Sequence, residues 1–306
     1  MKRDLLSLRD LSMEEVLYLV SRGRELKAAR TEGRLVPTCA GRILGLIFVK
    51  PSTRTRASFE TAMYRLGGQC LFMTAQDTQI SRQEPPADTA RVLSRYLDAI
   101  VVRTFAQEEV ETLAQFSTIP VINGLTDRFH PCQVLSDLMT IQEKRGTLEG
   151  LRVAWIGDGN NVAHSWINAA VLLDFTIFLS CPPGYTPNQE VLQWARSQNR
   201  GKIYLIEDPR EAVRSADVLY TDVWASMGQE EEAAARREIF RPYQVNENLL
   251  AAAPPHALVL HCLPAHRGEE ITDAVMEGPQ SVIFDQAENR LYLQMALLDW
   301  LLNGAP

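Results

Sequence analysis

Apolar residues along the chain occur in short continuous runs that alternate with segments of helical periodicity. In the first half, the runs that predict buried strands lie at 43–49, 70–73, 99–103 and 120–123. The segments with helical spacing lie near 12–30, 54–66, 87–97, 107–116 and about 133–145. This alternation of strand and helix predicts a parallel α/β sheet.

The pattern restarts after a polar break that contains glycine, KRGTLEG at 144–150. The strand runs that follow, with helices between them, are LRVAWIG, TIFLS, KIYLI, DVLYTDV and ALVLHCL. The final segment, NRLYLQMALLDWLLNG, predicts an amphipathic closing helix that ends at Gly304 and has one apolar face formed by Leu291, Met295, Leu298 and Leu302. We therefore predict two α/β domains, residues 1–145 and 146–287, with a helix at about 288–306 that packs back on the first.

Composition narrows the class of protein. The 306 residues are 46% hydrophobic and 23% charged, as in an ordinary globular protein, and the formal net charge of −7 argues against a general nucleic-acid binder. Five scattered cysteines without zinc-type spacing indicate a reduced, cytosolic chain. Neither a signal peptide nor a membrane span is indicated. The most polar patch, QEEEAAARRE at 229–238, is predicted to be a solvated helix surface.

The start of one predicted helix has an unusual distribution of charge. The stretch KPSTRTRASFE at 50–60 places Lys50, Arg54 and Arg56 at or just before the first turn, with no acid until Glu60. A helix N-terminus carries partial positive charge and favours acidic side chains, so these cations stand at its unfavourable end. The pattern indicates that a negative charge from outside the helix belongs there.

An anion of phosphate size would complete this turn. Free backbone N–H groups, the hydroxyls of Ser52, Thr53 and Thr55, and the guanidinium of Arg54 could converge on it. The alternative is that Ser52 only caps the helix while both arginines extend to water. The P-loop pattern GxxxxGK[ST] is absent from the sequence.

Two other strand ends in the first half carry polar residues. His130 and Gln133, in the loop DRFHPCQ before a helix, could aim an imidazole N–H and an amide NH2 at one carbonyl oxygen, as oxyanion stabilisers do. A lone loop histidine is also compatible with a structural role. Arg103, at the end of AIVVR, is either an exposed strand end or a third cation at the same place.

Three motifs follow strands in the second half. GDGNNVAHS matches a dinucleotide fingerprint only in part, because Val162 takes the place of the third glycine, and its asparagines could instead cap the next helix or bind a carboxylate. DVWASMG places Asp222 and Ser226 at a strand end, although an ordinary loop capped by serine has the same pattern. His261 and Cys262 are adjacent on an extended segment, so they are predicted to point to opposite sides and not to form a nucleophilic pair.

These motifs and their order resemble the aspartate/ornithine carbamoyltransferase family. The shared features are STRTR followed by SFE, and HPCQ as the HPxQ element; GDGNN, DVWASMG and HCLPAHRGEEI are similar to the ornithine branch. The match runs from about residue 40 to the end. It implies the carbamoyltransferase fold, in which interdomain helices join two parallel-sheet α/β domains, and a homotrimer or assembly of trimers with shared active sites. SRQE at 81–84 differs from the glycine-containing tetrad of many relatives, which affects the shape of that loop.

The resemblance implies a carbamoyl phosphate site. The matching positions are the phosphate cradle of Ser52, Thr53, Arg54 and Thr55, the carbonyl-binding group of Arg103, His130 and Gln133, the nearby Arg290, and Gln79, which is contributed by an adjacent subunit. It also implies an ornithine site. Its matching positions are Asn161, Asp222, Ser226 and Met227 for the α-carboxylate and α-amino groups, and Cys262 with the Leu263 carbonyl for the δ-amine and the carbamoyl phosphate. The residues expected to be catalytic are Arg54, Arg103, His130, Asp222 and Cys262, without a metal or organic cofactor.

The activity implied by the resemblance is transfer of the carbamoyl group from carbamoyl phosphate to the δ-amine of L-ornithine, giving citrulline and phosphate. This serves arginine biosynthesis or, in reverse, citrulline breakdown, and the expected partners are small molecules rather than nucleic acid or membrane. Three alternatives stay open. They are a carbamoyltransferase for putrescine or another amine, a nicotinamide-dependent dehydrogenase, and a phosphate-binding protein that turns nothing over.

Overall fold

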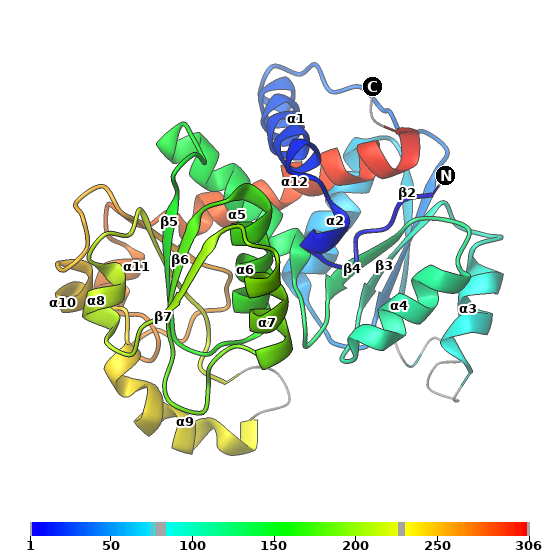
Figure 1. Cartoon of the computed structure of the whole chain (residues 1–306). Helices are drawn as coiled ribbons and strands as arrows, with labels where there is room; N and C mark the ends of the chain where they lie inside the picture. Colours follow the sequence, from blue (N-terminus) through cyan, green and yellow to red (C-terminus); the bar gives the residue numbers. More distant parts are fainter. Residues whose placement is uncertain (1, 75, 77–83, 226–229, 305–306) are drawn as a thin grey trace. The chain divides into compact units, whose positions relative to one another are not determined.

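The computed structural model describes residues 2–74, 76, 84–225 and 230–304. The chain divides into two compact units, which Figure 1 shows in ribbon form. The first unit comprises Met1–Met139 together with Asn289–Pro306, and the second comprises Thr140–Glu288. Helices α5 (Pro131–Arg145) and α12 (Ile283–Asn303) each cross a boundary between the units, so these two helices join them.

The first unit contains a four-stranded parallel sheet with the strand order β2-β1-β3-β4. Its elements besides α5 and α12 are η1 (Leu8–Asp10), α1 (Met13–Thr31), β1 (Ile43–Phe48), α2 (Thr53–Arg65), β2 (Gln69–Thr74), α3 (Pro86–Leu93), β3 (Ala99–Arg103), α4 (Gln107–Phe116) and β4 (Val121–Leu125). The central strands are continuous apolar runs because helices cover both faces of a parallel sheet, whereas the edge strand β2 is only partly buried.

The direction of the connections decides which face of the sheet each helix covers. The chain passes from β1 outward to β2, then crosses back to β3 and continues to β4. Because such crossovers are right-handed, α2 lies on one face and α3 with α4 on the other. Helices α3 and α4 pack side by side, and their apolar residues form a core with Ile47, Ile100 and Val102.

The beginning of the chain covers the free edge of β4. Leu5 forms a parallel bridge with Ile122, and its N–H donates to the Val121 carbonyl at 3.0 Å. The Val121 N–H donates to a carboxylate oxygen of Asp4 at 2.8 Å. The remaining exposed edge of this sheet is therefore β2.

The second unit contains a five-stranded parallel sheet with the strand order β7-β6-β5-β8-β9. Its elements are β5 (Arg152–Ile156), α6 (Asn161–Leu173), β6 (Thr176–Ser180), α7 (Gln189–Ser197), β7 (Lys202–Leu205), α8 (Pro209–Val213), β8 (Val218–Thr221), η3 (Glu230–Glu232), α9 (Ala233–Phe240), η4 (Arg241–Tyr243), α10 (Glu247–Leu250), β9 (Leu258–His261) and α11 (Asp273–Met276). The same handedness places α6 and α7 on one face and α8 and α10 on the other, and each pair is in contact.

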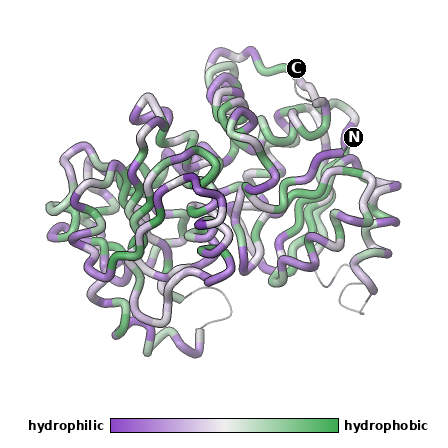
Figure 2. Tube along the Cα trace, viewed as in Figure 1, coloured by the Kyte–Doolittle hydropathy of each residue, from purple (hydrophilic) through white to green (hydrophobic). Residues whose placement is uncertain are grey.

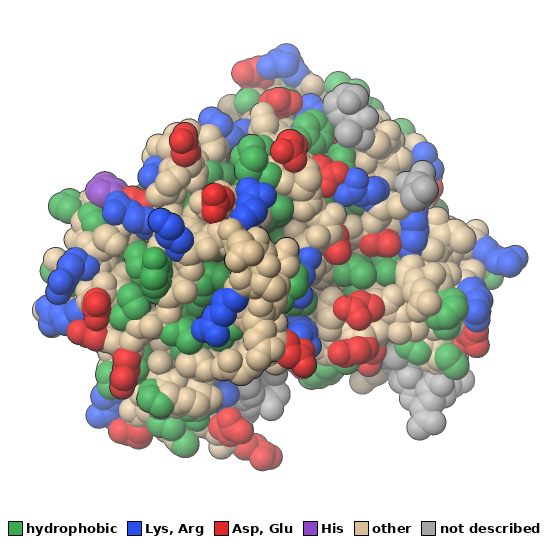
Figure 3. Space-filling model, viewed as in Figure 1, with side chains coloured by type: hydrophobic (Ala, Val, Ile, Leu, Met, Phe, Trp, Pro, Cys, Tyr) green, Lys and Arg blue, Asp and Glu red, His purple; other side chains and the backbone are tan. Residues whose placement is uncertain are grey.

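The hydropathy of the chain follows this layering. In Figure 2 the strands of both sheets are mainly hydrophobic, and the hydrophilic stretches lie in the helices and loops around them. On the face shown in Figure 3, acidic and basic side chains are interspersed. None of the described helices is long and apolar enough to cross a membrane.

The predicted alternation of strands and helices is confirmed, and the largest difference concerns the closing helix. It begins at Ile283, and residues 292–298 are all buried, so the prediction of a single apolar face is wrong. The reason is that α12 packs between partners within the first unit. Asp299 pairs with Arg22 of α1 at 3.1 Å, and Arg290 donates to Thr55 of α2 at 2.9 Å.

A buried carboxylate ties together the amino-terminal ends of the strands in the second unit. Asp217, just before β8, accepts from the Arg152 N–H at 2.9 Å and lies 3.2 Å from Nε2 of His256 and 3.6 Å from Arg145. Burial raises the pKa of Asp217, but the hydrogen bonds from Arg152 and His256 outweigh burial and hold the pKa below its usual value. This network lies at the edge of the sheet opposite to the strand ends that carry the sequence motifs.

We expect Asp217→Asn to lower the free energy of unfolding by about 2 kcal/mol at neutral pH, because charge-assisted hydrogen bonds are lost. A carboxylate whose pKa is lower in the folded state stabilises the protein above its unfolded pKa, and that contribution disappears as the pH falls through the folded pKa. The variant and the unaltered protein should therefore differ less in their free energy of unfolding, measured by urea denaturation, below a pH of about 3.8. Asp88→Asn, in an exposed pair with Arg91, is the control and should change stability little. An equal effect of both substitutions would contradict this role of Asp217.

Candidate functional site

The reversal of strand order marks one position in each sheet where a ligand can approach backbone groups. In an open parallel sheet, neighbouring strands whose connections leave in opposite directions leave a crevice at their carboxyl ends. In the first unit these strands are β1 and β3, which end beside Lys50 and Arg103. In the second unit they are β5 and β8, which end beside Gly157 and Asp222. STRTR, Arg103, GDGNN and DVWASMG lie at these strand ends, whereas HPCQ follows the neighbouring strand β4 and HCLP follows the neighbouring strand β9.

Helix α2 begins at the carboxyl end of β1 with the expected free N-terminus. Ser52 is its N-cap, and its hydroxyl accepts from the Thr55 N–H at 3.2 Å. The first turn contains no acidic residue. The guanidinium of Arg54 is half-buried and forms no hydrogen bond or ion pair with another residue in the described part of the chain. Ser52 thus does cap the helix, and the turn also offers a cation that has no counter-charge among the residues that the structure describes.

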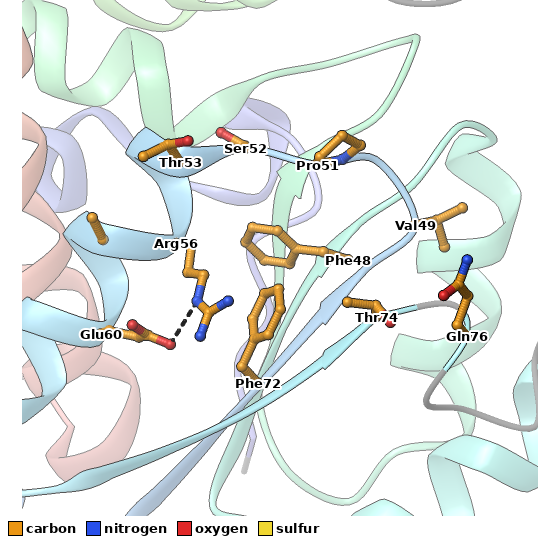
Figure 4. Close-up of a pocket in the computed structure, with 11 residues that line it drawn as sticks. Phe48, Val49, Pro51, Ser52, Thr53, Arg56, Glu60, Phe72, Thr74 and Gln76 are labelled. Carbon is orange, nitrogen blue, oxygen red and sulfur yellow. Dashed lines mark hydrogen bonds and ion pairs between the residues drawn. The ribbon is translucent and has the colours of Figure 1, made fainter.

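Arg56, which is not among the predicted site residues, interacts with other side chains of the first unit. Its Nε lies 3.0 Å from a carboxylate oxygen of Glu60, and its guanidinium carbon lies 3.6 Å from the centre of the Phe72 ring. Figure 4 shows these three side chains at the wall of a cavity of about 630 Å³, which Ser52 and Thr53 also line. The cavity therefore adjoins the N-terminus of α2 on its β2 side.

A hydrogen-bonded chain of side chains connects α12, α2 and α5 within the first unit. Arg290, almost fully buried, donates from Nη2 to Oγ1 of Thr55 at 2.9 Å and from Nη1 to Oε1 of Gln133. The amide nitrogen of Gln133 donates to Asp137 at 2.8 Å. This bond uses one of the two N–H groups of the amide, so the prediction that Gln133 aims its NH2 at a substrate carbonyl stays a prediction. The buried Asp137, one helical turn later, holds that nitrogen, and the amide oxygen faces Arg290.

The charges around Arg103, His130 and Arg290 favour the binding of an anion. Arg103 and His130 are buried, and Arg290 contributes further positive charge beside them. Burial, with the charges of Arg290 and Arg103, holds the pKa of His130 well below its usual value. His130 is therefore a neutral imidazole at pH 7 and can donate one N–H without adding charge. Lys50, also buried, pairs with Asp127 and lies over the Phe105 ring.

In the second unit, the loop after β5 is shaped by close packing rather than by a nucleotide. A Cβ added to Gly159 would lie 2.3 Å from the backbone nitrogen of Pro187, so only glycine fits there. Asn160 caps α6 by accepting from the N–H groups of Val162 and Ala163, and its amide nitrogen donates to Asp222 at 2.8 Å. Asn161, predicted to bind substrate, is the first residue of α6. Asn160, which the sequence left with two possible roles, is the residue that fixes Asp222.

Asp222 joins the ends of β5, β8 and β9. One carboxylate oxygen accepts from Asn160, and the other accepts from the Cys262 thiol at 3.0 Å and from the Val223 N–H at 2.8 Å. A ring nitrogen of His261 lies within 4.8 Å of the sulfur and the carboxylate, closer than an extended segment predicts. The chain turns sharply just afterwards, because Leu263 adopts a left-handed φ of 59°. The conclusion that the two residues form no nucleophilic pair is unaffected, because both ring nitrogens of His261 bond elsewhere.

The burial of one charged side chain, Arg236, could not be predicted from the sequence. Arg236, in the patch predicted to be a solvated surface, is 6% exposed and donates to the Trp224 carbonyl at 2.8 Å. It also lies 3.3 Å from the carboxylate of Asp158. Burial raises the pKa of Asp158 to about 6, with Asp222 adding to the effect and Arg236 opposing it. Arg236 thus links the loops that follow β5 and β8, and its spacing among other charged residues gave no signal of this.

Three expected site residues, Gln79, Ser226 and Met227, lie outside the described residues. Among the described residues, two groups bring three metal-ligand atoms each within 4.8 Å, namely Asp222, His261 and Cys262, and His266, Glu269 and Glu270. In each group, one side chain already has hydrogen-bond or ion-pair partners that compete with a metal ion. His261 is fully engaged, and Glu269 pairs with Arg237 at 2.9 Å.

Comparison with known proteins gives concordant results for both units. Residues 3–143 match the carbamoyl-P binding domain model of aspartate/ornithine carbamoyltransferase, and residues 149–301 match its Asp/Orn binding domain model. The chain is 55% identical over 302 residues to an ornithine carbamoyltransferase of Syntrophus aciditrophicus, covering 99% of this chain and 100% of the relative. It is 52% identical over 303 residues to an anabolic ornithine carbamoyltransferase of Pseudomonas aeruginosa, covering 99% and 98%.

A solved structure, the ornithine carbamoyltransferase from Pyrococcus furiosus, superposes with a TM-score of 0.95 at 50% sequence identity, covering 100% of this chain and 98% of the other. The family match extends over both units, and the relatives match along almost their whole length. The chain belongs to the aspartate/ornithine carbamoyltransferase family.

Proposed function

We propose that this protein transfers the carbamoyl group from carbamoyl phosphate to the δ-amine of L-ornithine, forming L-citrulline and phosphate. The observation that carries the proposal is the 55% identity over 302 residues with a relative of that name, which extends across both units. The geometry of the two sites fits the two substrates. A relative named as anabolic supports arginine biosynthesis as the direction. The five free cysteines support a reducing compartment such as the cytoplasm.

Carbamoyl phosphate binds in the first unit in this proposal. Its phosphate occupies the N-terminus of α2, where Ser52, Thr53, Arg54 and Thr55 supply N–H groups, hydroxyls and a guanidinium, and Arg103 approaches from β3. The partial positive charge of the helix and the guanidinium of Arg54 then act on the same anion. This removes the charge mismatch of the empty turn.

In this proposal Gln133, His130 and Arg290 hold the carbamoyl group. The amide oxygen of Gln133 accepts from Arg290, and in this scheme its second lone pair accepts from the carbamoyl NH2. The neutral His130 donates to the carbonyl oxygen, and Arg290 lies beside both. As the amine attacks, negative charge develops on that oxygen and is stabilised by Arg54, Thr55, Arg103 and His130, while phosphate leaves into the α2 N-terminus.

Ornithine binds in the second unit. Asp222 accepts hydrogen bonds from its α-amino group, Asn161 with Ser226 and Met227 holds its α-carboxylate, and Cys262 with the Leu263 carbonyl orients the δ-amine and contacts the carbamoyl phosphate. The amine must be neutral to attack, and the departing phosphate takes up the proton that it releases. No organic cofactor or metal takes part in this scheme.

The alternatives have less support. Gly159 is required by the close approach of the Pro187 backbone, and Gly157 adopts a φ of 126°, so the glycines of GDGNN are explained without a dinucleotide. A protein that only binds phosphate would not need Asp222 and Cys262 hydrogen-bonded to each other at the ends of β8 and β9. Putrescine lacks the α-carboxylate that Asn161 is proposed to hold.

We expect a panel of amines to identify the acceptor. With carbamoyl phosphate, L-ornithine should give a carbamoylated product at a rate at least about 10²-fold above putrescine, lysine, aspartate and acetylornithine, because a site built for polar groups rejects analogues that leave them unpaired. The measurement is colorimetric detection of the carbamoylated product at equal substrate concentration. A preference for putrescine, or no product with any amine, would refute the assignment.

Replacement of Arg54 should separate catalysis from folding. We expect Arg54→Ala to lower kcat by at least about 10³-fold, because the charge that stabilises the transition state and the leaving group is lost. Because this guanidinium has no partner in the described part of the chain, the midpoint of thermal unfolding should stay the same. Arg91→Ala, which removes an exposed arginine, should leave both quantities unchanged. Near-normal turnover of Arg54→Ala would contradict the phosphate assignment.

A homotrimer is part of the proposal. The edge strand β2 exposes Leu71, 48% accessible, and α2 exposes Tyr64, 55% accessible. Both elements also contribute residues to the wall of the cavity beside Ser52 and Thr53. A second copy of the chain that covers this surface would bury the apolar side chains and could bring its Gln79 to the phosphate. One contact would thus cover the exposed edge of the sheet and supply the residue expected from an adjacent subunit.

We expect light scattering to give the mass of three chains for the unaltered protein. Leu71→Asp places a charge in the proposed contact, so it should shift the protein towards smaller species and lower its activity in proportion. Val36→Asp, at a position 64% accessible in the loop before β1, should change neither. If the unaltered protein is monomeric and fully active, the shared site is wrong.

A further inference from the structure

The segment that follows β9 has a backbone conformation that its own sequence does not favour. Leu263 adopts a φ of 59°, in the left-handed region that non-glycine residues rarely occupy. Such conformations persist where surrounding contacts over-determine them, and they concentrate at functional sites. The neighbouring Cys262 donates its thiol hydrogen to Asp222. The contacts that hold this segment therefore decide where the groups proposed to meet the δ-amine lie.

The imidazole of His261 is one of these contacts, and its tautomer follows from its partners. The Leu263 N–H donates to Nδ1 of His261 at 2.9 Å. A backbone N–H can only donate, so Nδ1 must carry a lone pair and no proton. In a neutral imidazole the proton is then on Nε2, which lies 3.0 Å from Oε1 of Glu270 and donates to it. The side chains of both residues are 0% exposed.

Glu270 holds both ends of the turn. The same oxygen, Oε1, that accepts from His261 also accepts from the His266 N–H at 2.7 Å. Glu270 is itself anchored, because its carbonyl accepts from the Val245 N–H at 2.8 Å. One buried carboxylate oxygen thus restrains the Leu263 peptide through an imidazole and the His266 peptide directly.

The direction of the Leu263 N–H fixes the direction of a carbonyl. The peptide bond between Cys262 and Leu263 is trans, so its C=O points away from its N–H. With the N–H turned to His261, the Cys262 carbonyl must face away from the imidazole. The left-handed Leu263 then turns the next carbonyl out of line with the strand. If the imidazole carried a proton on Nδ1, two N–H groups would oppose each other and this arrangement would be lost.

We infer that His261 and Glu270 are positioning residues for the transfer reaction, which hold the Cys262 and Leu263 peptides in the orientation that receives the δ-amine and the carbamoyl NH2. This inference rests on the proposed function. It assigns no chemical step to the histidine. The imidazole acts as a spacer with a fixed acceptor at Nδ1 and a fixed donor at Nε2, and the carboxylate selects that tautomer.

Two substitutions separate the roles of the two ring nitrogens. In His261→Asn, the amide oxygen can stand near the position of Nδ1 and accept from Leu263, but the contact with Glu270 is lost. In His261→Gln, the longer amide can reach Glu270 in place of Nε2, but Leu263 loses its acceptor. We expect His261→Gln to lower kcat by about 10²-fold, the effect of a displacement near 1 Å at a reacting centre, and His261→Asn to lower it by less than about 10-fold.

Further readouts distinguish positioning from general support of the fold. The inhibition constant of inorganic phosphate should stay within about 2-fold in both variants, because the phosphate site belongs to the first unit. Glu270→Gln keeps an acceptor for the imidazole, so it should retain more of the kcat than Glu270→Ala. Equal kcat values for the Asn and Gln variants, or a fall in thermal stability without any change of kcat, would overturn the inference.

A spectroscopic measurement tests the tautomer without any use of activity. The sequence contains five histidines, so the imidazole nitrogens of the full-length protein can be assigned by nitrogen-15 NMR with the help of single substitutions. We expect a protonated Nε2 and an unprotonated Nδ1 for His261 at neutral pH, and a loss of this preference in Glu270→Ala. A proton on Nδ1 would overturn the inference even if ornithine is the substrate. Failure of the ornithine assay in the unaltered protein would instead refute the proposed function.

Discussion

Both sites depend on the reversal of strand order within each parallel sheet. Parallel strands all end at the same edge, and helices that leave neighbouring strands towards opposite faces keep the space beyond those ends clear of backbone. The reversal lies between β1 and β3 in one sheet and between β5 and β8 in the other. The α2 N-terminus, Arg103, the loop after Gly157 and Asp222 lie at these positions because the topology leaves no other uncovered strand ends of this kind.

The two sites carry charges of opposite sign. The first unit gathers Arg54, Arg103 and Arg290 around a helix N-terminus, and the buried histidine among them stays neutral. The second unit centres on Asp222, which is held by an asparagine amide and a thiol. A dianionic donor and an acceptor with an ammonium group are complementary to these fields. The same low-dielectric surroundings that keep His130 neutral also strengthen every donor aimed at a developing negative charge.

The sequence predicts the layers of the fold well, because buried parallel strands are continuous apolar runs and the helices between them keep their own period. It also predicts an anion at the first turn of α2, since cations there contradict the helix dipole. It fails where a residue's role is set by distant partners. The orientation of the Gln133 amide depends on Asp137 and Arg290, and the burial of Arg236 depends on the Trp224 carbonyl and Asp158. The burial of α12 on most of its sides reflects packing against α1 and α2, which no local pattern of polar residues could show.

The division of the chain also has a consequence for its synthesis. The first unit is built from two separate stretches of the chain, since α12, which carries Arg290, follows the second unit in the sequence. The second unit is a continuous segment, so it can acquire all its strands while the first still lacks its final helix. The proposed phosphate site therefore gains Arg290 only after the whole second unit has been synthesised, and a nascent or truncated chain that stops before residue 290 lacks the guanidinium that links Thr55 to Gln133.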